Sequence, residues 1–150
     1  MGTKYEGTDQ EQLALSAYIN LVRAAESLFS RLNQRRSPNA LTLGQYMVMD
    51  ALYFLGPLSQ KEIGIKVLKS NGNITMVVQH LERDGLVCRA RRPEDQRTMT
   101  VRLTPKGQHL MEDLVPQRLQ SIVEEMAVLS PKELQMLRRL CRMVGKAKRD

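Results

Sequence analysis

The sequence contains few of the residues from which metal centres, disulfide frameworks and many catalytic sites are built. Among its 150 residues are two cysteines and two histidines. Cys88 and Cys141 lie far apart without C-x-x-C spacing, which argues against a disulfide framework or a zinc ribbon, and we predict that both thiols are reduced and buried. The sequence also lacks a G-x-S-x-G motif and a phosphate-cradling glycine loop. We therefore predict no catalytic residue, no cofactor and no enzymatic activity.

One histidine has neighbours that could bind a metal. His109, Glu112 and Asp113 would share one face of a helix. A single imidazole with exposed carboxylates is more typical of a solvated helix face, so we predict no metal site.

Long apolar runs are absent as well. No run approaches the roughly 20 residues needed to cross a bilayer, and the first residues, MGTKYEGTDQEQ, lack the apolar core of a signal peptide. The basic tail RRLCRMVGKAKRD could attract an anionic membrane, but cations are also favoured at helix carboxy termini, and we interpret the tail as a solvated helix end. We expect a cytoplasmic protein without a membrane partner.

Charge narrows the choice of partner. The net charge is +7 and the pI is near 9.7, which favours nucleic acid, an anionic membrane surface or an acidic protein. A chain of this length is sufficient for one domain. Charge alone does not choose among the three partners.

Helix-start signals recur along the chain. Four Ser or Thr residues are each followed three positions later by Glu or Gln, which is the capping box: Thr8 with Glu11, Thr42 with Gln45, Ser59 with Glu62, and Ser130 with Glu133. Ser70, and Thr104 followed by Pro105, mark two further starts. The sequence thus predicts six helices, over 9–34, 43–55, 59–68, 71–84 and, as two long helices, within 104–149. Pro116 should kink the fifth or split it in two.

The terminal helices carry apolar stripes at three-and-four spacing. Residues of the first stripe are Leu13, Ala17, Tyr18, Leu21, Ala24, Ala25, Leu28 and Leu32, and those of the last are Leu134, Leu137, Leu140, Cys141 and Val144. A small lobe cannot cover both stripes, so we predict that residues 1–36 and 108–150 form a helical dimerisation region of a homodimer. The alternative is a monomer whose terminal helices fold against its own lobe.

The middle of the chain, residues 41–107, has the pattern of a winged helix-turn-helix. Two short helices with a tight joint, 59–68 and 71–84, indicate a helix-turn-helix. After Gly85 the period changes from 3.6 to 2, and residues 93–96 supply a turn, which predicts a two-stranded ribbon. The predicted fold class is therefore mainly α with a small β-wing: a winged helix-turn-helix lobe plus terminal dimerisation helices.

A winged helix places its second helix in the major groove of DNA and its ribbon beside it. With Ile74, Val77, Val78 and Leu81 facing the core, the outer face contains no acidic residue between Ser70 and Leu81, and the ribbon is rich in arginine. We predict contact with double-stranded DNA; the alternative is a merely solvated helix face. The predicted contacts are Ser70, Asn71, Asn73, Thr75, Met76, Gln79, His80, Arg83, Arg91 and Arg92.

The stretches GPLSQKEIG and SNGNITMVVQHLERDGLVCRARRPEDQRTMTVRLTPKG strongly resemble the MarR family of bacterial transcription regulators. The resemblance implies a winged-helix homodimer controlled by a ligand or by oxidation. It also implies that Asp95 braces the wing and that Arg97 enters the minor groove. By the same resemblance, Ser59, Gln60 and Lys61 approach phosphate. The usual Asp-Arg-Arg wing signature is Asp95-Gln96-Arg97 here, so one basic contact is missing, and Met76 replaces a residue that is basic or polar in many relatives.

The predicted function is that of a sequence-specific DNA-binding transcription regulator, a repressor that binds a pseudo-palindromic operator as a homodimer and is released by a small-molecule effector. Tyr18, Tyr46 and Met47 are the candidate ligand residues, where the dimerisation helices meet the lobe, or they are plain core. One alternative is a thiol-based redox sensor using Cys88, near Arg89 and Arg102 in the ribbon, or Cys141. The other is a small-molecule binding protein that does not bind DNA.

Overall fold

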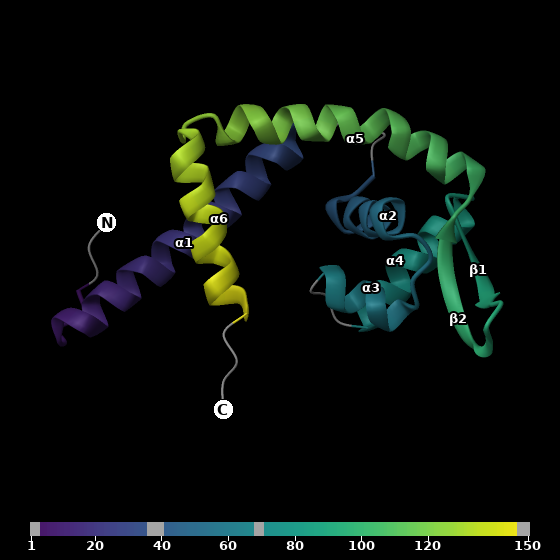
Figure 1. Ribbon diagram of the computed structural model, residues 1–150, viewed down its shortest axis with the longest axis horizontal. Helices are drawn as coiled ribbons and strands as arrows, with labels where there is room; N and C mark the ends of the chain where they lie inside the picture. Colours follow the sequence, from purple (N-terminus) through teal and green to yellow (C-terminus); the bar gives the residue numbers. More distant parts are fainter. Residues whose placement is uncertain (1–3, 36–40, 68–70, 147–150) are drawn as a thin grey trace. The chain divides into compact units, whose positions relative to one another are not determined.

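The computed structural model describes residues 4–35, 41–67 and 71–146, without the side chains of residues 71 and 72 (Figure 1). The chain divides into two compact units: Met1–Arg36 with Gln120–Asp150, and Ser37–Leu119. We call the first the helical unit and the second the lobe. No described helix is long and apolar enough to span a membrane.

The lobe contains a three-helix core followed by a hairpin. Its elements are α2 (Leu43–Leu55), α3 (Gln60–Val67), α4 (Asn71–Arg83), β1 (Val87–Arg92), β2 (Asp95–Leu103) and the first part of α5 (Pro105–Met126). Figure 1 shows the hairpin following directly on α4. This order is that of a winged helix-turn-helix, and the predicted fold class is confirmed.

The helix ends lie where the local sequence predicted them. The Thr42 hydroxyl accepts from the Gln45 backbone N–H, and the Gln45 side chain accepts from the Thr42 backbone N–H. At the other end of α2, Gly56 has a positive φ of 79°. Gly85 has φ 72° after α4, and the next N–H, that of Leu86, bonds the Leu81 carbonyl at 2.9 Å. Glycine adopts this left-handed conformation at little cost.

The hairpin is antiparallel and pairs Val87 with Leu103 and Arg91 with Met99. Its turn is only Pro93–Glu94, shorter than the predicted 93–96, because Arg92 pairs with Asp95. The register shifts between Arg91 and Arg92, and residues 96–98 of β2 form a bulge. Leu58, before α3, adds a third, one-residue strand: its backbone exchanges two hydrogen bonds with Val101. The hairpin is therefore held to the helices and not isolated.

The core of the lobe is formed by apolar side chains of all its elements. Ile74, Val78 and Leu81 are buried and Val77 is partly buried, as the helical spacing predicted. The other buried members are Val48, Met49, Leu52, Ile63, Val67, Leu86, Val87, Val101 and Met111. A Cβ at Gly107 would lie 2.0 Å from the Leu86 carbonyl oxygen. Only glycine allows α5 to begin this close to the strand.

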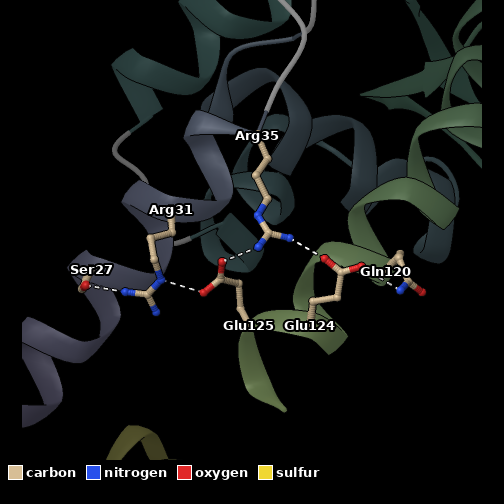
Figure 2. Close-up of polar contacts among 6 residues, drawn as sticks. All are labelled: Ser27, Arg31, Arg35, Gln120, Glu124 and Glu125. Carbon is tan, nitrogen blue, oxygen red and sulfur yellow. Dashed lines mark hydrogen bonds and ion pairs between the residues drawn. The ribbon is translucent and has the colours of Figure 1, made fainter. Parts of the chain in front are cut away.

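The helical unit comprises α1 (Asp9–Gln34), the second part of α5 and α6 (Pro131–Lys146). Two arginines near the end of α1 pair with two glutamates near the end of α5 (Figure 2). Arg31 Nε donates to Glu125 at 2.6 Å, and Arg35 bridges Glu124 at 2.6 Å and Glu125 at 2.9 Å. Ion pairs therefore hold these two helix ends together.

Two predictions about single residues need correction. Pro116 does not split the fifth helix, since α5 continues through it as one element. The prediction that both cysteines are buried is wrong: Cys141 is exposed and Cys88 is only half-buried. Burial of Cys141 needs a surface against α6, which has no buried residue in the single chain. Cys88 pairs in the hairpin with Arg102, whose side chain is exposed and leaves the thiol partly open to solvent.

Candidate nucleic-acid interface

Helix α4 exposes a polar face with no acidic residue between Asn71 and Leu81; the exposed carboxylate of Glu82 follows near its end, 3.5 Å from Arg89. Asn73, Met76, Gln79 and His80 are exposed, and Thr75 is half-buried. Three of them, together with Gly44 of α2, line a shallow hollow of about 270 Å³. Arg83 is exposed at the end of the helix, 3.4 Å from Asp84. Ser70 and the Asn71 side chain lie outside the described residues.

Hydrogen bonds within the lobe hold most side chains at the start of α3 in place. Ser59 Oγ accepts from the Glu62 N–H at 3.2 Å, and Glu62 accepts from the Ser59 N–H at 2.7 Å, so both side chains cap the helix. Gln60 Nε2 donates to Thr75 Oγ1 of α4 at 3.0 Å. Of the three residues expected near phosphate, Lys61 alone is exposed.

The tip of the hairpin is shaped by a carboxylate. Asp95 accepts from the Thr98 hydroxyl at 2.6 Å and from the Arg97 backbone N–H at 2.9 Å. These two donors, the hydroxyl first, lower the pKa of Asp95 below its usual 3.8, so the side chain is ionised at neutral pH. Arg97 is exposed, and no described residue pairs with its guanidinium.

The other arginines of the hairpin bind within the lobe. Arg91 donates to the Gln96 carbonyl. Arg92 Nη2 lies 2.7 Å from Glu62 Oε2, and Arg89 Nε lies 3.5 Å from Glu82. The backbone N–H of Ser59 and then the Arg92 guanidinium lower the pKa of Glu62. Arg92, a predicted DNA contact, is paired with Glu62 within the lobe.

The three candidate ligand residues are divided between the two units. Tyr18 is exposed on α1 of the helical unit, whereas Tyr46 and Met47 are partly buried beside the core of the lobe. Burial, and then the Asp50 charge, raise the pKa of Tyr46 to about 12. Arg118 of α5 lies 5.4 Å from the centre of its ring. Sequence reasoning missed Asp50 and Arg118; the i, i+4 spacing of Tyr46 and Asp50 was the available signal.

Cys88, the candidate for redox chemistry, and His109, the candidate for metal binding, each have one polar neighbour. Cys88 Sγ lies 3.3 Å from Arg102 Nε. His109 Nδ1 lies 3.7 Å from Glu112. Within the described ranges, no group of three His, Cys, Asp or Glu side chains could hold a metal ion.

Comparison with known proteins matches this geometry to one family. The MarR family profile matches residues 41–99. The HTH-type transcriptional regulator MhqR of Bacillus subtilis (strain 168) is 33% identical over 132 residues, which cover 88% of this chain and 91% of that protein. The chain belongs to the MarR family. This MarR-family chain is thus a transcription regulator.

Solved structures resemble the MarR-family chain along most of its length. BpsR of Bordetella bronchiseptica has a TM-score of 0.79 and 25% identity, covering 87% of this chain and 99% of that one. PcaV of Streptomyces coelicolor, in complex with its natural ligand, has a TM-score of 0.70 and 26% identity, covering 95% and 99%. The winged-helix fold of the lobe is shared with proteins of known regulatory role.

Proposed function

We propose that this MarR-family protein is a repressor that binds a pseudo-palindromic operator in double-stranded DNA as a homodimer. The observation that carries the proposal is the exposed face of α4, which has no acidic residue before Glu82 near the helix end, next to a hairpin in which the guanidinium of Arg97 has no partner among the described residues. Carboxylates on such a face would repel phosphate. None occurs between Asn71 and Leu81, and Glu82 is paired with Arg89 at 3.5 Å.

We infer a role in DNA binding for several predicted contacts from their exposure and their chemistry. The amides of Asn73 and Gln79 have donors and acceptors that suit base edges, and Met76 suits a thymine methyl group. Lys61 and Arg83 are exposed cations that suit phosphate. Arg97 suits the narrow minor groove, where negative potential is concentrated.

Uncovered apolar side chains in the helical unit support a homodimer. Leu13 of α1 is 72% exposed, and Leu140 and Val144 of α6 are 46% and 65% exposed. Patches of this kind mark association surfaces in monomeric chains. A two-fold dimer would bury them and would present two lobes to half-sites about one helical turn apart, roughly 34–36 Å. The alternative is a monomer whose terminal helices cover these side chains by folding against its own lobe.

A small-molecule effector is the proposed signal for release. DNA binding by BpsR is regulated by 6-hydroxynicotinic acid, and PcaV binds a natural ligand. We propose that Tyr46 and Met47 of the lobe contact the effector, and Tyr18 of the helical unit stays a separate candidate ligand residue. The proposed location is the cytoplasm, where a repressor meets its operator.

Binding-site selection with the full-length chain tests the proposal directly. A library of randomised duplexes is incubated with the protein, bound duplexes are amplified, and the cycle is repeated at a constant salt concentration. We expect a two-fold symmetric motif whose half-sites lie about one helical turn apart. Binding without enrichment of any motif would contradict sequence-specific regulation, and enrichment of a single half-site would contradict the homodimer.

Oxidation is a second candidate signal, favoured by one contact. The Cys88 thiol lies beside the Arg102 guanidinium at 3.3 Å, and cationic neighbours are typical of reactive cysteines. Peroxide treatment of the wild type, Cys88→Ser and Cys141→Ser proteins tests it. Release of DNA that is lost only in Cys88→Ser would support this signal, and release in all three or in none would exclude it.

A further inference from the structure

A five-residue segment at the start of α3, residues 58–62, touches both DNA-facing elements of the lobe. We call it the joint. The Leu58 backbone donates to the Val101 carbonyl at 3.1 Å and accepts from the Val101 N–H at 2.8 Å. Glu62 pairs with Arg92 of β1 at 2.7 Å, and Gln60 donates to Thr75 of α4 at 3.0 Å. Two contacts thus lead to the hairpin and one leads to α4.

We propose that the joint fixes the orientation of the wing relative to α4, and that Gln60, Glu62 and Arg92 are positioning residues and not DNA contacts. The proposal rests on the DNA-binding function proposed above. It replaces the expected phosphate contact of Gln60 and the expected DNA contact of Arg92 with contacts inside the lobe.

The Glu62 carboxylate links two local structures through one oxygen. Oε2 accepts from the Ser59 backbone N–H at 2.7 Å, which closes the α3 cap, and from Arg92 Nη2 at 2.7 Å. The wing is therefore connected to a side chain that is itself held by the cap of α3. A two-stranded ribbon has little stability by itself, so its direction depends on such contacts.

The Gln60 contact lies on the part of α4 that would read bases. Thr75 is one helical turn before Gln79, so the two share a face. A hydrogen bond to Thr75 sets the distance between the joint and this face. The three contacts together place the wing arginine and the base-reading side chains at a constant separation. A constant separation is needed because both must contact the same DNA site at the same time.

Simple electrostatics makes the opposite prediction. If Arg92 contacted phosphate and Glu62 only reduced the local positive charge, removing the Glu62 charge would tighten DNA binding. If Glu62 positions the wing, the same change weakens binding although the protein becomes more basic. The pair is partly exposed, with side-chain exposures of 42% and 32%, and exposed pairs contribute little to folding stability. A large effect on binding can thus be separated from unfolding.

The test compares Glu62→Gln with Glu133→Gln. Both substitutions keep an oxygen for the helix cap and remove one negative charge, but Glu133 caps α6 in the helical unit, where its Oε2 accepts from the Ser130 N–H. The probe is the duplex recovered by binding-site selection, followed by fluorescence anisotropy, with thermal unfolding measured alongside. We expect about tenfold weaker binding for Glu62→Gln, unchanged binding for Glu133→Gln and similar melting temperatures. Arg92→Gln, which leaves the α3 cap intact, should show the same loss.

A double substitution identifies the wing as the route. In an Arg97→Ala background the wing has lost its groove contact. Glu62→Gln should then weaken binding by less than about threefold, because no wing arginine is left for Glu62 to position. Tighter binding of Glu62→Gln, or equal losses with and without Arg97, would overturn the inference. A wild-type chain that enriches no duplex would instead contradict the proposed function, so the two failures are distinguishable.

Discussion

At the scale of single residues, the hairpin tip combines a shaping carboxylate with an exposed cation. Asp95 accepts two hydrogen bonds within the turn region, and one of them comes from the backbone of Arg97 itself. The guanidinium is left exposed, while the neighbouring arginines at positions 91 and 92 bind inside the lobe. Arg97 is therefore the arginine of the ribbon that we propose for the groove contact.

Arg97→Ala should weaken operator binding and reduce its salt dependence. Loss of one phosphate contact lowers the slope of log K against log salt by about one unit. Fluorescence anisotropy at several salt concentrations measures the slope. Arg138→Ala, on α6 of the helical unit, is the control with the same charge change. An unchanged slope for Arg97→Ala would show that this side chain does not approach phosphate.

Asp95→Ala should also weaken operator binding, although it makes the protein more basic. The carboxylate bonds that shape the tip are lost, and so Arg97 is no longer held in place. Operator affinity at a constant salt concentration is the measurement, and Glu94→Ala, at the adjacent turn residue, is the matched control. Tighter binding by Asp95→Ala would mean that the ribbon acts only through its charge.

Asp50 gives a pH-dependent prediction for the lobe. Burial raises the pKa of Asp50 above 3.8, and this outweighs the hydrogen bond from Tyr46 and the charge of Arg118, which lower it. A raised folded-state pKa favours the folded state below 3.8, and this contribution is lost as the pH rises through the folded pKa. The wild type should therefore gain stability relative to Asp50→Asn as the pH falls from 7 to 4. Thermal unfolding at both values measures this, with Asp113→Asn, an exposed α5 aspartate, as the control; a relative loss of wild-type stability on acidification would contradict it.

At the scale of elements, α4 has a buried side that forms the core and an outer side that is free for DNA. Ile74, Val78 and Leu81 anchor the first, while Gln79 and His80 lie on the second. The helix ends at a glycine cap, after which the strand begins. Recognition helix and wing therefore follow one another with few residues between them.

Gln79→Ala should reduce specific binding by about 1–3 kcal/mol and leave binding to random duplex almost unchanged, because base contacts specify and phosphate contacts do not. Competition between the selected operator and random duplex gives both affinities. Gln135→Ala, an exposed glutamine of α6, controls for loss of an amide. Equal losses on both duplexes would show that Gln79 does not read a base.

At the scale of the whole molecule, the chain has a lobe with its own core and a helical unit with uncovered apolar faces. The ion pairs of Arg31 and Arg35 with Glu124 and Glu125 join the ends of α1 and α5 (Figure 2). α6 contributes no buried residue in the single chain. The proposed homodimer would cover its apolar side.

Leu140→Asp should convert the dimer to a monomer and strongly weaken operator binding. A charge in an apolar interface cannot be hydrated, so association becomes unfavourable. Analytical ultracentrifugation measures the assembly, and anisotropy on the selected duplex measures binding, for which we expect a loss of about tenfold or more. Gln135→Asp, which adds the same charge on another side of α6, is the control. A Leu140→Asp chain that sediments as a dimer would place the interface elsewhere.

The sequence by itself determined the features that depend on residues close in the chain. Capping boxes fix helix starts because their two partners are three residues apart, and glycine fixes helix ends through its own φ. The change of period from 3.6 to 2 marks the wing for the same local reason. These signals were sufficient to predict the fold class and the core face of α4.

Tertiary structure alone decided which polar side chains meet. Glu62 and Arg92 are 30 residues apart and Gln60 and Thr75 are 15 apart, and no periodicity shows that a ribbon arginine lies beside a helix cap. The sequence therefore did not predict these two contacts, and it wrongly predicted that both cysteines are buried. Burial and pairing depend on what packs against a residue, and that is a property of the folded chain and not of its neighbours in sequence.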